Sequence, residues 1–342
     1  MTASAMTPST DLTADSQSPR PLDAWRGRVD PLDGQAGWRW HQVVRGWDGA
    51  MPDSAALHAG PRPVALLGLA SDEGVRRNQG RQGAASGPAQ LRSFLSNLPV
   101  QEDMNLLDAG DISCQGHDLE TAQARYAQQM STLIDQGHLP IGLGGGHEIG
   151  WASYLGWAQS RCVTQAPQAK LGLLNLDAHF DLRTAQHPTS GTPFLQALEH
   201  AKAHGLDLSY ACWGASESAN TRVLFERAEQ WGVNTRLDTE LGVQALPARL
   251  AELQAWLDGV DQVYLTICLD VLPAGVAPGV SAPSARGVPQ EVVEALVDTV
   301  LRSGKLVLAD VAEYAPAFDQ DGHTGRVAAR LVHRIARQGA AR

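Results

Sequence analysis

The stretch LGLLNLDAHFD, residues Leu171–Asp181, decides how this chain is interpreted. Its first six residues are mostly apolar, which is typical of a strand buried on both faces of a parallel sheet. Asp177, His179 and Asp181 follow at alternate positions. Burying three ionisable groups without partners is costly, so a cation or a salt-bridge network must balance them. Two carboxylates and an imidazole suit a hard or borderline divalent ion. The alternative to a metal site is a polar strand end with one capping aspartate.

Three other apolar runs also end in ionisable side chains. These runs cover residues 140–143, 263–269 and 305–312 and lead to His147, Asp270 and Glu313, respectively. Taken alone, a histidine after three glycines is more often a capping or core residue than a ligand. In open parallel sheets, however, ligands bind in the crevice beyond the carboxyl ends of the strands. We therefore expect the ends of all four runs to form one site.

Strand and helix patterns alternate from residue 64 onward, which predicts an α/β fold with a mostly parallel sheet and helices on both faces. A first strand is expected at 64–69. Helices are expected from about residue 88 and near residues 118–136, 193–204, 219–231, 247–258, 289–303 and 325–338. No composition break divides this region. We expect a flexible N-terminal tail at residues 1–22 and a single catalytic domain at residues 23–342.

Composition excludes several classes of function for the 342-residue chain. The formal net charge is −10 and the basic residues are scattered, which argues against binding to nucleic acid or to an anionic membrane. No apolar segment approaches the roughly 18 residues of a membrane span. The four cysteines have neither metal-site nor disulfide-scaffold spacing. Reduced thiols and a cytoplasmic location are the simplest expectation.

Three segments resemble the ureohydrolase (arginase/agmatinase) superfamily in order and separation: GGGHE at residues 144–148, DAHFD at residues 177–181, and Leu269-Asp270. The resemblance implies a three-layer α/β/α fold and hydrolysis of C–N bonds in guanidines and amidines. It also implies a cofactor of two Mn²⁺ per chain, with Asp177 bridging the ions. The implied metal ligands are His147, Asp177, His179, Asp181 and Asp270.

Within that superfamily the chain most resembles the formimidoylglutamase family. The motifs that carry this resemblance are DEGVRRNQGR at residues 72–81, FDLR at 180–183, SGTPF at 190–194, APGVSAP at 277–283 and AEYAP at 312–316. They imply hydrolysis of N-formimidoyl-L-glutamate to L-glutamate and formamide in histidine degradation. The implied mechanism is attack of a metal-bridging hydroxide on the formimino carbon. A homo-oligomer is expected, as in relatives.

Two residues depart from the superfamily pattern. Cys268 stands where the superfamily has a second bridging carboxylate. A cysteine beside two cations is readily deprotonated and can ligate them, and the alternative is a buried thiol with one weakly bound metal. Phe194 stands about where arginases have a histidine proton shuttle. We expect Cys268 to be a ligand.

The resemblance and the chemistry of the substrate assign the other site residues. Asp181 is expected to pass a proton to the leaving amine, and Glu313 to face the amidine nitrogens as a catalytic and substrate-binding residue. A substrate with two carboxylates needs cations, and Arg183 is the best candidate because guanidinium grips carboxylate at two points. Ser190 and Asn78 are further candidates. At least one residue of the set Arg76, Arg77, Asn78 and Arg81 is expected to reach the substrate.

Two alternatives stay open. One is another ureohydrolase, of the guanidinobutyrase or agmatinase type, although Arg183 argues against the cationic substrate agmatine. The other is a catalytically impaired, metal-binding relative, which Cys268 and Phe194 would favour. Formamide release and metal content separate these possibilities.

Overall fold

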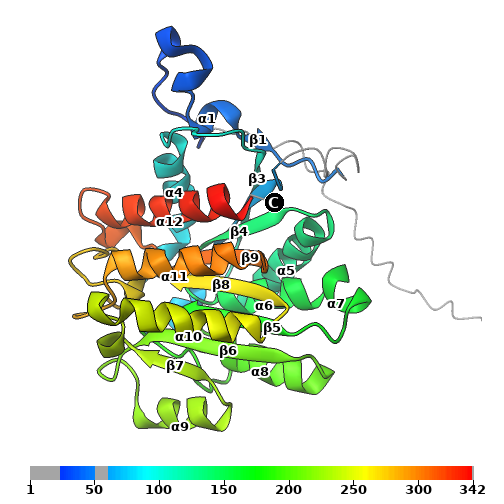
Figure 1. The fold of residues 1–342 in the computed structure, drawn as a ribbon, viewed down its shortest axis with the longest axis vertical. Helices are drawn as coiled ribbons and strands as arrows, with labels where there is room; N and C mark the ends of the chain where they lie inside the picture. The colour runs from blue at the N-terminus through cyan, green and yellow to red at the C-terminus, as the bar shows by residue number, and fades with distance from the viewer. Residues whose placement is uncertain (1–23, 51–60, 341–342) are drawn as a thin grey trace, which may run out of the picture.

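The computed structural model describes residues 24–50 and 61–340, and the expected tail at residues 1–22 lies outside them. Its centre is a nine-stranded sheet in the order β1-β3-β2-β4-β9-β8-β5-β6-β7 (Figure 1). Every neighbouring pair is parallel. The strands are β1 Arg45–Gly46, β2 Val64–Ala70, β3 Leu106–Ser113, β4 Leu139–Gly144, β5 Leu171–Leu176, β6 Leu208–Ala215, β7 Asn234–Leu237, β8 Gln262–Cys268 and β9 Leu306–Ala312.

Side chains of the central strands alternate between two hydrophobic cores, because successive residues of a strand point to opposite faces. In β2, Val64 and Leu66 belong to one core, whereas Ala65, Leu67 and Leu69 belong to the other. Both faces of the strand are therefore buried. This explains why the central strands read as continuous apolar runs and not as alternating ones.

Helices cover both faces of the sheet. Residues of α4, α10, α11 and α12 join one core, and residues of α5, α6, α8 and α9 join the other. The predicted three-layer α/β/α fold is thus confirmed. The helices are α1 Trp40–Val43, α3 Glu73–Arg77, α4 Gly87–Ser96, α5 Leu119–Asp135, α6 Ile149–Ala158, α7 Arg161–Gln165, α8 Pro193–His204, α9 Arg222–Gln230, α10 Leu246–Asp258, α11 Gln290–Arg302 and α12 His323–Gly339.

The predicted elements agree closely with the observed ones. The helix expected near 118–136 is α5, which begins after Asp118; the carboxylate of Asp118 caps it by accepting a hydrogen bond from the backbone N–H of Thr121 (3.1 Å). The sequence patterns gave no range for the strands β1, β3, β6 and β7 or for the short helices α1, α3 and α7. The elements of two to five residues carry too few residues to display a period, and β3 and β6 mix polar with apolar residues.

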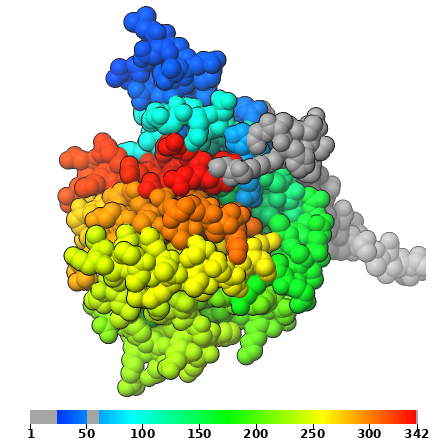
Figure 2. Space-filling model, in the orientation of Figure 1, coloured from blue at the N-terminus to red at the C-terminus, as the bar shows by residue number. Residues whose placement is uncertain are grey.

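The first described residues project from one end of the molecule, near α4 (Figure 1 and Figure 2). The backbone N–H of Trp40 donates to the carbonyl of Leu98 (2.9 Å), and the Trp40 side chain is buried. The 3-10 turn Pro31–Gly37 contributes no buried residue. Among the helices in the described part of the chain, none has the length and apolar character that crossing a membrane requires.

Candidate metal centre

The carboxyl ends of the four adjacent strands β4, β9, β8 and β5 meet at a cavity of about 210 Å³. This is the geometry expected for apolar runs that each end in an ionisable residue. Ten of the residues predicted for the site line the cavity, namely Asn78, His147, Asp177, His179, Asp181, Arg183, Ser190, Cys268, Asp270 and Glu313. The structure brings them together, and their individual roles stay predictions.

The glycine turn after β4 positions His147. A Cβ at Gly145 would lie 1.8 Å from the backbone oxygen of Ser71, so only glycine lets this turn pass against the end of β2. His147 follows directly, and its side chain is 2% exposed. Its Nδ1 lies 2.9 Å from Oδ2 of Asp177 and 2.9 Å from Oδ2 of Asp181.

A second group of ligand atoms gathers around His179. Its Nδ1 lies 3.1 Å from Oδ2 of Asp270 and 3.5 Å from Oδ1 of Asp177. Two sets of three residues each offer ligand atoms within 4.8 Å of one another, namely His147, Asp177 and Cys268, and Asp177, His179 and Asp270. Asp177 belongs to both sets through a fully buried carboxylate. A carboxylate that belongs to both groups can serve two neighbouring cations.

The donor set fits divalent cations. His147 Nδ1 is buried and makes no hydrogen bond of good geometry within the described residues, although two carboxylate oxygens lie close to it. Such a nitrogen is oriented as a ligand and not as a hydrogen-bond donor. Four carboxylates and one arginine, Arg183, line the cavity, so the site carries an excess of negative charge that a cation would offset. Imidazole and carboxylate suit Mn²⁺.

The pKa values of the cluster reflect the same excess of negative charge. Burial opposes the charged imidazolium, but the contacts with Asp177 and Asp181 raise the pKa of His147 well above its usual value. Burial, together with the neighbouring Asp177 carboxylate, raises the pKa of Asp181 to about 6. Carboxylates that draw protons in this way also attract cations.

Glu313 is fixed at the rim where β9 ends. Its Oε1 accepts a hydrogen bond from the backbone N–H of His147 (2.8 Å), and its Oε2 accepts one from the hydroxyl of Ser281 (2.5 Å). Burial raises the pKa of Glu313 to about 7. Glu313 and Asp181 have φ values of +72° and +49°, in the left-handed region that non-glycine residues rarely adopt. Such strain gathers at functional sites.

Two contacts of the site were not anticipated from the sequence. The hydroxyl of Thr266 lies 3.0 Å from Nε2 of His147 and fixes the orientation of that ring. Ser281 holds Glu313 and lines the cavity. Thr266 lies two residues before Cys268, on the same side of β8, which is the signal that could have revealed it. Ser281 lies within the APGVSAP motif, which had been assigned no role.

Cys268 ends β8 with its side chain in the cavity. Burial raises the pKa of its thiol well above the usual value when no cation is present. A cation bound by His147, Asp177 and Cys268 would instead lower the pKa of the thiol, because a coordinated thiol loses its proton.

Replacing Cys268 with alanine is expected to weaken manganese binding by about tenfold or more, because one donor is lost from the His147 group. Cys268→Asp should restore the affinity, since it supplies a carboxylate. Elemental analysis during manganese titration measures both effects. Wild-type metal content and affinity in Cys268→Ala would remove Cys268 from the ligand set.

The cavity is also lined by the polar residues expected at the substrate. Arg183 is exposed and lines the cavity, and Ser190 and Asn78 lie beside it. The side-chain amide of Asn78 donates to the hydroxyl of Ser190 (3.2 Å). Within the described residues, the Arg183 guanidinium makes no hydrogen bond or ion pair, so it is available to an anionic ligand.

The other basic residues of the loop after β2 are held elsewhere. Arg76 pairs with Glu73 (2.6 Å). Arg81 donates to the carbonyls of Val280 and Ser281 and stacks on the ring of Phe318. At least one of Arg76, Arg77, Asn78 and Arg81 was expected to reach the substrate. Of these four residues, Asn78 lines the cavity and the three arginines do not.

Phe194 does not line the cavity. Its ring packs edge-on against the imidazole of His147, with centroids 5.1 Å apart and planes at 80°, and it is fully buried. A proton shuttle must reach the reacting atoms, and this position provides only an apolar support for the histidine ring.

Comparison with known proteins agrees with this geometry. The Arginase family profile matches residues 62–337, which is most of the chain. The chain belongs to the arginase family. Among curated members, the formimidoylglutamase of Ralstonia nicotianae is 53% identical over 321 residues, covering 93% of this chain and 97% of that protein. The formimidoylglutamase of Aeromonas hydrophila is 46% identical over 322 residues, covering 94% and 99%.

Solved structures of arginase-family proteins share the fold. The crystal structure of formimidoylglutamase from Bacillus subtilis superposes with a TM-score of 0.76 at 21% identity, over 96% of each chain. Trypanosoma cruzi formiminoglutamase with Mn²⁺ superposes with a TM-score of 0.70 at 23% identity, over 86% of this chain and 100% of that one. At such identities the likeness concerns the fold alone.

Proposed function

We propose that the protein is a manganese-dependent hydrolase of N-formimidoyl-L-glutamate that releases L-glutamate and formamide. The observation that carries the proposal is one cavity that holds two ligand groups sharing Asp177, with Glu313 and the uncommitted Arg183 at its walls. The relatives named formimidoylglutamase, which align along nearly the whole chain, support this substrate. The reacting carbon of this substrate is a planar amidine carbon bonded to two nitrogens, one of which carries the chain with its two carboxylates.

Two Mn²⁺ would be held by the two groups. His147, Asp177, Asp181 and Cys268 would hold one, and Asp177, His179 and Asp270 the other. When bound, such ions supply a hydroxide nucleophile at neutral pH and stabilise negative charge on oxygen.

The chain's own residues would bind and orient the substrate. The carboxylate of Glu313, held at both oxygens by His147 and Ser281, faces the cavity and would pair with the amidine N–H donors. Arg183 would grip a carboxylate of the glutamate portion. The contacts of Glu313 with the amidine and of Arg183 with a carboxylate would together hold the planar amidine carbon in a fixed position in the cavity.

Asp181 would carry the proton to the departing amine. Its Oδ2 faces His147, which leaves Oδ1 for a proton and the leaving nitrogen. A carboxylate at this position can take a proton from the attacking water and pass it to the leaving nitrogen. The oxygen of water would add to the formimino carbon, and the C–N bond to the glutamate nitrogen would break as that nitrogen takes the proton. The carbon would then leave as formamide, with its oxygen from the water.

The test is a substrate panel with the purified, manganese-loaded protein. We expect formamide release from N-formimidoyl-L-glutamate, and at least about a hundredfold lower kcat/KM for agmatine, because a cation meets Arg183 instead of a carboxylate. The panel includes guanidinobutyrate and arginine, scored by urea release. Urea from guanidinobutyrate as the best reaction would replace the proposal with a guanidinobutyrase, and absence of hydrolysis despite full metal content would favour an impaired relative.

A further inference from the structure

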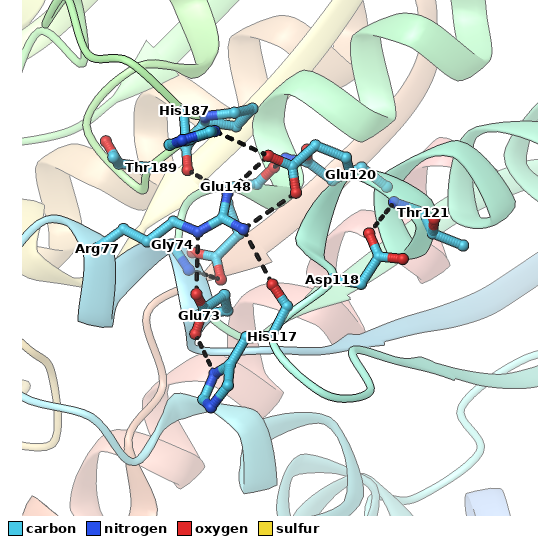
Figure 3. A network of polar contacts seen from close by, with 12 residues as sticks. Glu73, Gly74, Arg77, His117, Asp118, Glu120, Thr121, Glu148, His187 and Thr189 are labelled. Carbon is cyan, nitrogen blue, oxygen red and sulfur yellow. Dashed lines mark hydrogen bonds and ion pairs between the residues drawn. The ribbon is translucent and has the colours of Figure 1, made fainter.

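Arg77, at the end of α3, has all its side-chain donors engaged although it lies at the protein surface. Its Nε donates to Glu73 (2.9 Å), and its two terminal nitrogens donate to both carboxylate oxygens of Glu120 (2.8 and 3.0 Å). The same nitrogens also donate to the carbonyls of Pro188 (3.1 Å) and His117 (2.9 Å). Figure 3 shows the guanidinium between Glu73, Glu120 and His117.

These partners belong to segments that are distant in the sequence. His117 follows β3, Glu120 lies in the first turn of α5, and Pro188 lies in the loop that joins β5 to α8. The side chain of Arg77 is only 17% exposed. A planar guanidinium with five directed donors can hold three segments in one arrangement, which an ammonium group cannot do.

The loop that Arg77 contacts through Pro188 is the loop that carries the substrate-facing residues. Ser190 lies two positions beyond Pro188, and its hydroxyl accepts a hydrogen bond from Asn78, the residue after Arg77. The backbone N–H of Arg183 donates to the carbonyl of Gly191 (2.8 Å), which closes the loop. Residues 184–187 between these points are exposed.

Arg183 also lies across the backbone of this loop. A Cβ at Gly191 would lie 2.7 Å from Cδ of Arg183 and 3.1 Å from Nδ2 of Asn78. The position of the Arg183 side chain therefore depends on where residues 188–191 lie. Arg77 ties this part of the loop to α3 and α5, and the other charged contact between the loop and α5 among the described residues is the long, exposed pair of His187 with Glu120 (3.9 Å).

We propose that Arg77 is a positioning residue for substrate binding, which holds the loop of residues 183–191 so that Arg183 and Ser190 face the substrate. The inference rests on the proposed function, since it assigns these residues to the glutamate portion of the substrate. Arg77 itself does not line the cavity and does not touch the reacting atoms. It acts on the affinity for the substrate and not on the metal centre.

The neighbouring Arg76 offers a matched control. It has the same charge, lies on the same helix and pairs with the same Glu73, but it is 46% exposed and makes no contact with the 183–191 loop among the described residues. Loss of either arginine removes one positive charge beside Glu73. Only the loss of Arg77 also removes the hydrogen bond to the carbonyl of Pro188.

The experiment compares steady-state kinetics of the manganese-loaded wild type, Arg77→Ala and Arg76→Ala with N-formimidoyl-L-glutamate. We expect Arg77→Ala to raise KM by about tenfold, the effect of losing one charge-assisted contact, with kcat and metal content within about twofold of the wild type. Arg76→Ala should change KM by less than about twofold, as expected of an exposed pair. If Arg77→Ala does not fold, Arg77→Lys decides, because it keeps the charge but loses the forked contacts.

A double-mutant cycle with Arg183 separates positioning from simple structural support. If Arg77 acts through Arg183, the rise in KM caused by Arg77→Ala should largely disappear in the Arg183→Ala background. A fall in melting temperature without a change in KM would overturn the inference, as would equal effects of Arg76→Ala and Arg77→Ala, or fully additive effects in the cycle. A wild type that does not hydrolyse the substrate would instead refute the proposed function, so the two failures are distinguishable.

Discussion

Replacing Asp177 with asparagine is expected to lower kcat by about a thousandfold or more, because metal ions that activate water would lose the ligand that both groups share. Asp177 is the residue shared by both ligand groups. An amide has one oxygen and no charge, so it cannot bridge two cations as a carboxylate does. Metal content per chain, measured by elemental analysis after gel filtration, should fall together with kcat.

Asp238→Asn is the control for Asp177→Asn. Asp238 is also a buried carboxylate, but it lies outside the cavity. Its replacement should leave the metal content and kcat unchanged. If Asp177→Asn retained two bound ions and wild-type turnover, the arrangement of ligands around a shared aspartate would be refuted. A chelator followed by manganese provides the corresponding test on the wild type, with activity lost and then recovered.

Replacing Glu313 with glutamine is expected to lower kcat/KM by about a hundredfold, the loss that follows when one strong charge-assisted contact to the reacting group is removed. Glutamine has nearly the same shape and can still accept the hydrogen bond from the backbone N–H of His147. The change therefore removes the charge while keeping the packing. Because Glu313 belongs to neither ligand group, the metal content should stay at the wild-type value.

Glu148→Gln is the matched control for Glu313→Gln. Glu148 is equally buried and lies one residue beyond His147, but it does not line the cavity. Burial raises the pKa of Glu148 to about 8, so this side chain is already largely neutral at pH 7 and resembles glutamine. Its replacement should leave kcat/KM within about threefold of the wild type. Equal losses in both variants would indicate damage to the fold and not loss of an amidine contact.

The fold and the composition of the cavity could be predicted because both depend on local patterns. Strands buried on both faces leave long apolar runs, and β2, β4, β5, β8 and β9 were located from such runs. Since parallel strands end on the same edge, ionisable residues after these runs had to meet. His147, Asp177 and Asp270 therefore lie together as expected. The motif resemblance added Arg183 and Ser190, which no periodicity could reveal.

The remaining contacts could not be predicted, because they depend on which of several equivalent groups meet in space. The chain carries three arginines within six positions, and each makes different contacts. Arg76 contacts Glu73, Arg77 joins three segments of the chain, and Arg81 contacts the loop at residue 280. Sequence gives no rule for this choice. The same holds for the contact of Ser281 with Glu313, whose residues belong to different loops. The single catalytic domain and the role of each cavity residue stay predictions.

The assembly of the cavity from the ends of separate strands has a consequence for how the chain acquires its ligands during folding. The backbone of His147 binds Glu313 across 166 positions, and β4 pairs directly with β9. Partners so distant in sequence meet late, because loop closure must be completed before such pairs gain stability. The two ligand groups are therefore complete only after β8 and β9 have been synthesised and have entered the sheet between β4 and β5. Bound manganese would then stabilise the finished sheet selectively over partly folded chains.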